Sequence, residues 1–284
     1  MLIDLHTHSS ISDGTDSPAE LVAAAVTAGL DVVALTDHDS TAGWQAARES
    51  LPAGLTLIPG VELSCRWYGA DPPIGLHLLG YLFDPGYPDL VAELGRIRHG
   101  RERRAERIVG LLRADGIDVT WREVQGYAIG GVVGRPHLAQ ALIRRGLVDS
   151  VSAAFAPEWL GERYRVTKSD VDVFRGLRLI QDAGGVAVFA HPKAHRRGPI
   201  VPDTLIGELA DAGLFGIEAD HVDHGPAERE QVRRLAADLG LVVTGSSDYH
   251  GDNKLVRLGE NTTAPQAYHR IVAAAHGASP IEAA

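Results

Sequence analysis

Three residue types are scarce in this chain of 284 residues: it has one cysteine, one methionine and, among 27 basic residues, only Lys168, Lys193 and Lys254 as lysines. With Cys65 alone, no intrachain disulfide can form, and a reducing compartment suits the protein. No apolar run reaches the length of about 18 residues that a membrane span needs, and no basic segment leads into an apolar one. We therefore expect a cytoplasmic protein with no membrane partner.

The charge balance limits the classes of partner. The formal net charge is −10, so attraction to nucleic acid over the whole surface is not expected, although a local basic patch is compatible with this value. The chain is 45% hydrophobic and 23% charged, which is typical of a globular protein with a large buried core. No obligate protein partner is predicted.

Short apolar strands alternate with helical patterns at both ends of the chain but not in its middle. We expect strands at residues 2–8, 32–36, 55–58, 77–83, 186–190, 215–219 and 242–244. This alternation is typical of a parallel sheet, open or closed into a barrel. Residues 88–164 show only helical patterns. The sequence thus predicts an α/β fold in which residues 1–87 and 165–284 form the barrel and residues 88–164 form a helical insertion that caps the active site.

The first predicted strand carries two histidines one residue apart, in the stretch MLIDLHTHSS. Side chains alternate faces along a strand, so His6 and His8 point the same way, roughly 6–7 Å apart. That spacing suits two ligands of one metal ion. Alone, the pair fits a solvated sheet edge equally well.

Histidines and carboxylates also occur at or near the ends of the other predicted strands. They are Asp37, His38, Glu62, His77, His191, Glu218, Asp248 and His250. In a parallel barrel these strand ends share one rim, where active sites form. Imidazole and carboxylate together suit zinc, iron or manganese. The set exceeds the four or so ligands that one zinc ion takes, so we expect two to three divalent ions.

Taken in order, the motifs resemble those of the PHP (polymerase and histidinol phosphatase) family along nearly the whole chain. They are His6-Thr7-His8, Ser12-Asp13-Gly14, Thr36-Asp37-His38-Asp39, Gly60-Val61-Glu62, His191-Pro192 and Ser247-Asp248-Tyr249-His250. The resemblance implies a distorted seven-stranded (β/α) barrel with a trinuclear metal centre. Arg135-Pro136-His137 inside a helical insertion resembles the free-standing phosphoesterases of the family. Those include AMP phosphatases and 3′,5′-nucleoside bisphosphate phosphatases that also act as 5′-to-3′ exoribonucleases on short RNA.

The same resemblance implies three sets of metal ligands. The first is His6, His8, Glu62 and Asp248; the second is Glu62, His77 and His191; the third is Asp13, His38 and His250. Many family members have histidine where Asp13 stands. The carboxylate is a harder ligand that favours iron or manganese over zinc.

Amidohydrolase barrels offer an alternative, since they also begin with a His-x-His pair and commonly use a carboxylated lysine as a bridge. Lys193 is the only lysine close to a predicted strand end. Because Glu62 already supplies a bridging carboxylate, this alternative is disfavoured.

Substrate contacts and a proton donor are harder to assign. Arg135 is the best phosphate contact, because its guanidinium donates two parallel hydrogen bonds from the start of a helix. His137 and Lys168 are further substrate-binding candidates, although packing or solvation explains each as well. Asp39 and His221 are the candidates for the acid that protonates the leaving group, and the sequence does not choose between them.

Other polar residues are expected to act behind the ligands or not at all. Asp4, Asp37 and Glu218 suit hydrogen bonds to ligating side chains. The six arginines of residues 96–107 fit a solvated helix face better than a polyanion site. Five histidines fit no strand end and are expected at the surface: His99, His195, His224, His269 and His276.

We therefore expect a phosphoesterase that hydrolyses a nucleotide phosphomonoester, a 3′,5′-nucleoside bisphosphate or AMP, by a metal-activated hydroxide. The alternatives are a histidinol-phosphate phosphatase, which the Arg-Pro-His insertion disfavours, a 5′-to-3′ exoribonuclease on short RNA, and a non-catalytic metal-binding module. The complete set of candidate ligands argues against the last of these.

Overall fold

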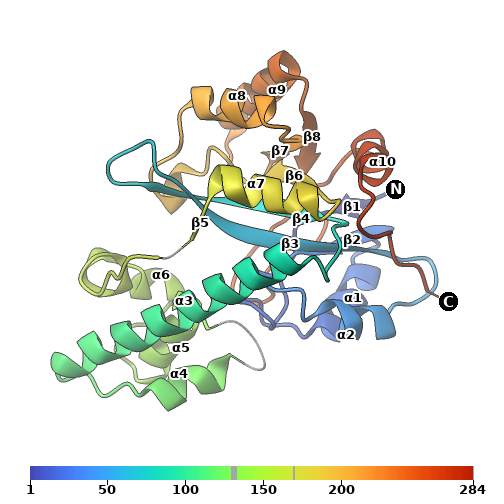
Figure 1. The fold of residues 1–284 in the computed structure, drawn as a ribbon. Helices are drawn as coiled ribbons and strands as arrows, with labels where there is room; N and C mark the ends of the chain where they lie inside the picture. The colour runs from blue at the N-terminus through green and yellow to red at the C-terminus, as the bar shows by residue number, and fades with distance from the viewer. Residues whose placement is uncertain (129–132, 169, 284) are drawn as a thin grey trace.

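The computed structural model describes residues 1–128, 133–168 and 170–283. Its centre is one mixed sheet, drawn in Figure 1 between helices on several sides. In spatial order the strands are β1 (Ile3–Asp4), β2 (Val32–Leu35), β3 (Thr56–Trp67), β4 (Ile74–Tyr81), β6 (Val186–Phe189), β7 (Gly216–Asp220) and β8 (Val242–Gly245), while β5 (Val171–Asp172) pairs with the outer part of β3. A parallel bridge between Thr7 and Tyr249 nearly closes the sheet into the expected seven-stranded barrel.

Four strands, β2, β6, β7 and β8, begin and end within one residue of their predicted positions. The prediction of an all-parallel sheet is wrong at β4, which runs antiparallel to both β3 and β6. Only six residues separate β3 from β4, too few for the crossover that a parallel pair requires. The short segment β5 was not predicted.

The third strand differs most from its prediction. It continues to Trp67 instead of ending at Ile58, so Glu62 lies inside the strand and not after it. His77 likewise lies within β4, directly opposite Ser64 of β3. The first strand is shorter than expected: only Ile3 and Asp4 pair with β2 in the ladder.

Among the described residues, six α-helices surround the barrel: α1 (Pro18–Thr27), α2 (Trp44–Glu49), α7 (Val173–Asp182), α8 (Asp203–Asp211), α9 (Pro226–Leu239) and α10 (Pro265–Ala274). The predicted start of α1 is confirmed, because the Ser17 hydroxyl accepts from the Glu20 N–H while the Glu20 carboxylate accepts from the Ser17 N–H. The two hydrogen bonds form a capping box that satisfies amides at the helix start. The chain end is tied down by paired backbone hydrogen bonds between Leu57 and Ile281.

A second group of helices lies between β4 and β5 and projects to one side of the barrel, at the lower left of Figure 1. It contains α3 (Pro88–Ala114), α4 (Trp121–Tyr127), α5 (Arg135–Arg144), α6 (Val151–Ala154) and the short helix η1 (Pro157–Gly161). Leu90, Leu94 and Ile97 at the start of α3 pack into the barrel core, whereas residues from Ala105 onward pack in a separate cluster. The long helix α3 thus joins the two parts. The domain boundaries at residues 87/88 and 164/165 stay a prediction.

In the part of the chain that the structure describes, none of the helices combines the length and the apolarity needed to cross a membrane.

Candidate metal centre and the cavity beside it

The predicted histidine pair lies at the mouth of the barrel. Just past β1, the His8 amide donates to the Tyr249 carbonyl at 2.9 Å, which fixes the chain against the segment after β8. Nε2 of His6 then lies 3.1 Å from Nε2 of His8. Both imidazoles are fully buried. The pair therefore points inward and not to a solvated edge.

Two carboxylates meet this pair. Oε2 of Glu62 lies 3.3 Å from Nε2 of His6 and 3.1 Å from Nε2 of His8, and Oδ1 of Asp248 lies 3.4 Å from each. The structure thus brings together the first predicted ligand set, with ligand atoms within 4.8 Å of one another. In a tetrahedral site with bonds of about 2.0–2.1 Å, ligand atoms lie about 3.3 Å apart. The separations of 3.1–3.4 Å in this cluster match that spacing.

Glu62 connects this cluster to the second predicted set. Its other oxygen, Oε1, lies 2.7 Å from Nδ1 of His77 and 3.0 Å from Nε2 of His191. Because β3 extends through Glu62 and pairs with β4, the carboxylate reaches His77 across the sheet. Its two oxygens therefore face two different groups of imidazoles, as a bridging ligand requires.

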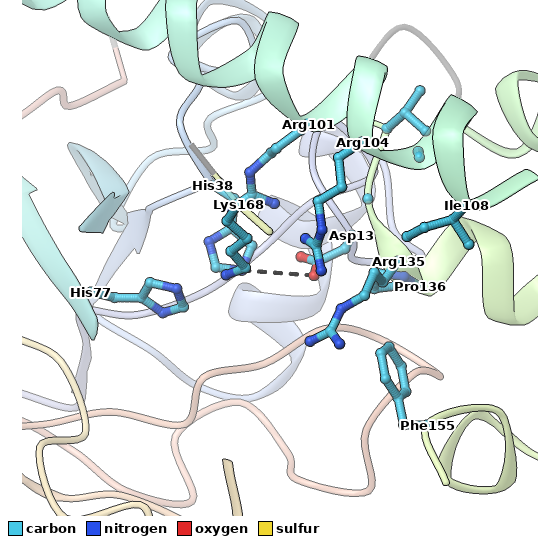
Figure 2. Close-up of a pocket in the computed structure, with 13 residues that line it drawn as sticks. Asp13, His38, His77, Arg101, Arg104, Ile108, Arg135, Pro136, Phe155 and Lys168 are labelled. Atoms are coloured by element: carbon cyan, nitrogen blue, oxygen red, sulfur yellow. Dashed lines mark ion pairs between the residues drawn. The ribbon is translucent and has the colours of Figure 1, made fainter. Parts of the chain in front are cut away.

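The third predicted set lies on the other side of His8. Asp13 is 3.2 Å from Nε2 of His250 and 3.7 Å from Nε2 of His38, the ion pair marked by the dashed line in Figure 2. His8 joins this set, and His38 also approaches Glu62, with Nδ1 3.1 Å from Oε2. The three sets therefore share side chains and form one continuous cluster.

The chemistry of the cluster fits a cation. Four of its buried atoms have no hydrogen-bond partner in the described structure: Asp13 Oδ1, His38 Nδ1, His77 Nδ1 and Asp248 Oδ1. Buried polar atoms without partners are costly unless something else satisfies them. A divalent ion held by nitrogen and oxygen ligands would do so, and the donor set, without sulfur, suits zinc, iron or manganese.

The electrostatics of the cluster point the same way. Burial alone would raise the pKa of Glu62, but the surrounding histidines outweigh it and hold that pKa well below its ordinary value. Burial would lower the pKa of His6, yet Asp248 and Glu62 raise it well above its usual range. Positive charge, supplied by protons or by metal ions, therefore stabilises the carboxylates of the cluster.

A second layer of polar side chains holds the ligands from behind, as predicted for Asp37 and Glu218. Oε1 of Glu218 lies 3.3 Å from Nδ1 of His6, and its Oε2 accepts from the His191 amide at 2.9 Å. Asp37 accepts from the Ser12 hydroxyl, whose oxygen lies 3.3 Å from Nδ1 of His8. Such partners fix the orientation of ligating imidazoles.

The two candidate proton donors have different surroundings. Oδ1 of Asp39 accepts from the Ser64 amide at 2.7 Å, and its Oδ2 lies 2.8 Å from Nε of Arg101. A carboxylate held between an N–H donor and a guanidinium is placed to accept hydrogen bonds, which disfavours Asp39 as the acid; the assignment of the acid stays a prediction. In His221, Nδ1 accepts from the Asp223 amide, which leaves the proton on Nε2, 3.2 Å from Asp248 Oδ2. His221 is therefore the candidate that can donate.

A cavity of about 210 Å³ opens directly from the cluster. Asp13, His38 and His77 lie on its barrel side, as Figure 2 shows. Cationic and apolar side chains from the helical part, and Lys168 from the segment before β5, line much of the rest: Arg101, Arg104, Ile108, Val133, Arg135, Pro136, Phe155 and Lys168. The site is thus a cluster of candidate metal ligands that faces a strongly cationic wall.

Contacts within the wall hold its arginines in place. Nε of Arg104 donates to the Val166 carbonyl at 2.9 Å. Arg135 donates to the Leu160 carbonyl at 3.3 Å, and its guanidinium lies 4.9 Å from the centre of the Phe155 ring. These neutral contacts leave the positive charges of both residues available to an anion.

The cationic side chains also affect one another's protonation. Burial lowers the pKa of the Lys168 ammonium to about 8, against the opposing charge of Asp170, and the nearby arginines lower it further. Burial and the positive charge of Arg135 likewise lower the pKa of Arg104 to about 9. Crowded positive charges of this kind favour a negatively charged occupant.

Three sequence predictions change at this site. His137 is buried, and its Nδ1 accepts from the Gly134 amide at 3.0 Å, so it caps α5 and does not line the cavity. Arg101 and Arg104 were expected on a solvated face but line the cavity instead. The signal was in the spacing, because positions 101 and 104 fall on the same side of α3 as Ile97 and Ile108.

Two more cations and one histidine were also missed. Arg197, in the short helix η2 (His195–Arg197), and Lys254 both bond Oδ2 of Asp248. His224, expected at the surface, is buried: its Nδ1 contacts the Ala219 carbonyl and its Nε2 accepts from the Lys193 amide. None of these three short segments has a periodic pattern from which the positions could be predicted.

Several known proteins are similar to this chain in sequence and in fold. The PHP domain profile matches residues 4–113. A 5′-3′ exoribonuclease from Haemophilus influenzae is 33% identical over 91% of this chain and 93% of its own. A 3′,5′-nucleoside bisphosphate phosphatase from Chromobacterium violaceum is 32% identical over 87% of each chain. The structure of a Bifidobacterium adolescentis protein assigned as a metal-dependent phosphoesterase superposes with a TM-score of 0.89 at 33% identity, covering 96% of each chain.

Proposed function

Because the chain belongs to the PHP family and is a hydrolase of phosphoric esters, we propose that it releases phosphate from a nucleotide phosphomonoester. The preferred substrate is a nucleoside that carries two phosphates, such as a 3′,5′-bisphosphate, with AMP as the single-phosphate alternative. One observation carries the proposal: the cluster of candidate metal ligands opens into a cavity lined by Arg101, Arg104, Arg135 and Lys168.

Two to three divalent ions, manganese, iron or zinc, would be held by the cluster. His6, His8, Glu62 and Asp248 form one set, Glu62 bridges to His77 and His191, and Asp13, His38 and His250 form the third. Bound there, such ions supply an activated water and neutralise charge on the phosphoryl oxygens.

The chain's own side chains would bind the rest of the substrate. One phosphate would lie over the cluster, and the second would be bound by Arg104, Arg135 and Lys168. A guanidinium pairs well with phosphate because it donates two parallel hydrogen bonds. Phe155 and Pro136 give the same cavity an apolar side suited to a ribose or a base. His221 would protonate the leaving oxygen from its imidazolium form, giving up the Nε2 proton while the Asp223 carboxylate, 3.9 Å from Nδ1, faces the second proton.

A second candidate substrate is a short RNA with a 5′-phosphate. Its first nucleotide carries a phosphate on each side of the ribose, so it presents the same pair of anionic groups to the cluster and the cationic wall. The similarity to an exoribonuclease supports this candidate. The two substrates differ in their leaving group: hydrolysis of the bisphosphate releases inorganic phosphate, whereas hydrolysis of the RNA separates its first nucleotide from the rest of the chain.

Phosphate release by manganese-loaded protein tests the proposal. The matched substrates are adenosine 3′,5′-bisphosphate, its 5′- and 3′-monophosphates and a short 5′-phosphorylated RNA. We expect kcat/KM for the bisphosphate to exceed that of either monophosphate by about 10-fold or more, the value of one charge-assisted contact. Preference for 5′-AMP would instead indicate a single phosphate site. No hydrolysis of any of the four, with metal bound, would contradict the nucleotide substrate.

The lowered pKa of Lys168 predicts a pH dependence of substrate binding. Since that pKa is about 8, the ammonium is charged at pH 7 and loses its charge as the pH rises through 8. Affinity for the second phosphate should therefore fall by roughly 10-fold between pH 7 and 9.5. KM measured across this range checks the effect. Lys168→Arg keeps its charge and should flatten the profile below pH 9, where Arg104, with a pKa of about 9, is still charged. An unchanged slope there would assign the pH dependence to another group.

A further inference from the structure

Asp39 is buried where the loop after β2, which carries the candidate ligand His38, meets the helices between β4 and β5. It follows His38 directly, is fully buried and has a φ of 53°, in the left-handed region that non-glycine residues rarely adopt. Its carboxylate does not enter the cluster, and it is not among the residues that line the cavity. A strained, buried acid beside a site but outside it calls for an explanation.

The contacts of Asp39 join three parts of the fold. Its amide donates to the Glu62 carbonyl at 3.1 Å, and its Oδ1 accepts from the Ser64 amide at 2.7 Å, so both ends of the residue are fastened to β3. Its backbone carbonyl accepts from Arg98 at 2.9 Å, and its Oδ2 lies 2.8 Å from Nε of Arg101. Arg98 and Arg101 both belong to α3, so Asp39 fastens that helix to the barrel mouth.

Arg101 is fixed from two sides by this arrangement. Its Nη2 donates to the Ser64 hydroxyl at 2.5 Å, while its Nε faces Asp39. The Nε proton is not aimed at the carboxylate oxygen, so charge and not a directed hydrogen bond holds that pair. Only 15% of the arginine side chain is exposed, yet it lines the cavity beside His38 and Lys168, as Figure 2 shows.

We propose that Asp39 is a positioning residue that holds Arg101 at the cavity wall in the orientation that receives a phosphate. The inference rests on the proposed function in one respect, that the cavity is the phosphate site. Without the carboxylate, Arg101 would keep one neutral bond to Ser64 and lose the carboxylate in direct contact with it, leaving only more distant acids such as Asp170. A guanidinium fixed before binding loses little rotamer freedom when phosphate arrives, whereas a free one must be ordered at that moment.

The test is Asp39→Asn, which keeps the size of the side chain and an oxygen for the Ser64 amide but removes the charge. We expect the dissociation constant of inorganic phosphate, measured by calorimetry on metal-loaded protein, to rise about 10-fold. KM should rise by a similar factor, and kcat should change less than about 3-fold, because binding and not the chemical step is affected. Bound metal should stay at the level of the unmodified protein.

Arg101→Gln should show the same changes, and the double variant should be no worse than Arg101→Gln alone, because Asp39 acts through Arg101. Arg103→Gln, an exposed arginine two positions further along α3, is the matched control and should leave phosphate binding unchanged. If Asp39→Asn fails to fold, Arg101→Lys tests the same contact: it keeps the charge but not the fixed fork, and should weaken phosphate binding partially.

Three results would overturn the inference. One is a fall in kcat with unchanged phosphate affinity, which a proton donor would give. Another is loss of bound metal in Asp39→Asn, which would mean that the residue places His38. The third is an additive double variant. Failure of the proposed function is a separate outcome, since it would appear as no hydrolysis by the unmodified protein in the substrate panel.

Discussion

Replacing Asp248 with asparagine is expected to lower kcat for phosphate release by on the order of 10³-fold or more and to reduce bound metal. Oδ1 of Asp248 faces both histidines of the first pair at 3.4 Å, and its Oδ2 faces Arg197, His221 and Lys254. Burial works against charge on Asp248, but the surrounding cations hold its pKa well below the ordinary value, so the side chain is an anion. A neutral amide would remove the carboxylate that those cations share, leaving Arg197 paired with Asp223 alone, and would offer a weaker ligand.

Asp220→Asn is the matched control for this prediction. Asp220 also ends a strand, β7, but pairs with Arg233 away from the cluster. Because partly exposed ion pairs contribute only about 0–1 kcal/mol, this variant should keep its metal content and its kcat within about 2-fold. Metal analysis and phosphate release on both variants give the comparison. Normal hydrolysis by Asp248→Asn would contradict the assignment of the cluster as the reaction centre.

The second large effect is expected from the cationic wall. Replacing Arg104 and Arg135 together with glutamine should lower kcat/KM for adenosine 3′,5′-bisphosphate by on the order of 10²-fold, because each charged hydrogen bond contributes about 1.5–3 kcal/mol. The monophosphate, which lacks the second phosphate, should lose far less. The ratio of kcat/KM for the two substrates, measured on each protein, isolates the effect from any general damage to the site.

Arg103 and Arg107 provide the control pair for this double variant. Both are exposed arginines of α3, and neither lines the cavity. Replacing both with glutamine removes the same total charge and should leave the substrate ratio unchanged. Equal losses for both double variants would indicate general electrostatic attraction and not a defined phosphate site.

The structure brings the predicted metal ligands together, although several of the strands that carry them differ from their predictions. His6, His8 and Asp248 lie together because strand ends in such a barrel share one rim, a consequence of topology that the motif order already contains. Glu62 and His77 belong to the same cluster for a different reason. They lie inside an antiparallel pair of strands, diagonally across from each other, with Glu62 opposite Leu79 and His77 opposite Ser64. That placement follows from a register that the sequence does not reveal.

Side-chain contacts between segments far apart in the chain could not be predicted from the sequence. Asp39 follows a candidate ligand and was a reasonable candidate for an acid, but its partner Arg101 is 62 positions away on α3. Arg101 and Arg104 could have been assigned to the buried face from helical spacing, yet the high density of arginine suggested solvent. Arg197 and Lys254 lie in irregular loops, where side-chain direction depends on the whole fold and not on a local period.

The most direct test of metal-dependent hydrolysis at this cluster is a metal titration followed by two readouts. The protein is stripped with a chelator and returned to manganese in steps, while bound ions are counted by mass spectrometry and phosphate release from adenosine 3′,5′-bisphosphate is measured. We expect the rate of phosphate release to rise with bound metal and to level off at about two to three ions per chain. Full hydrolysis by the stripped protein, or none after complete loading, would contradict a metal-dependent phosphoesterase that uses this cluster.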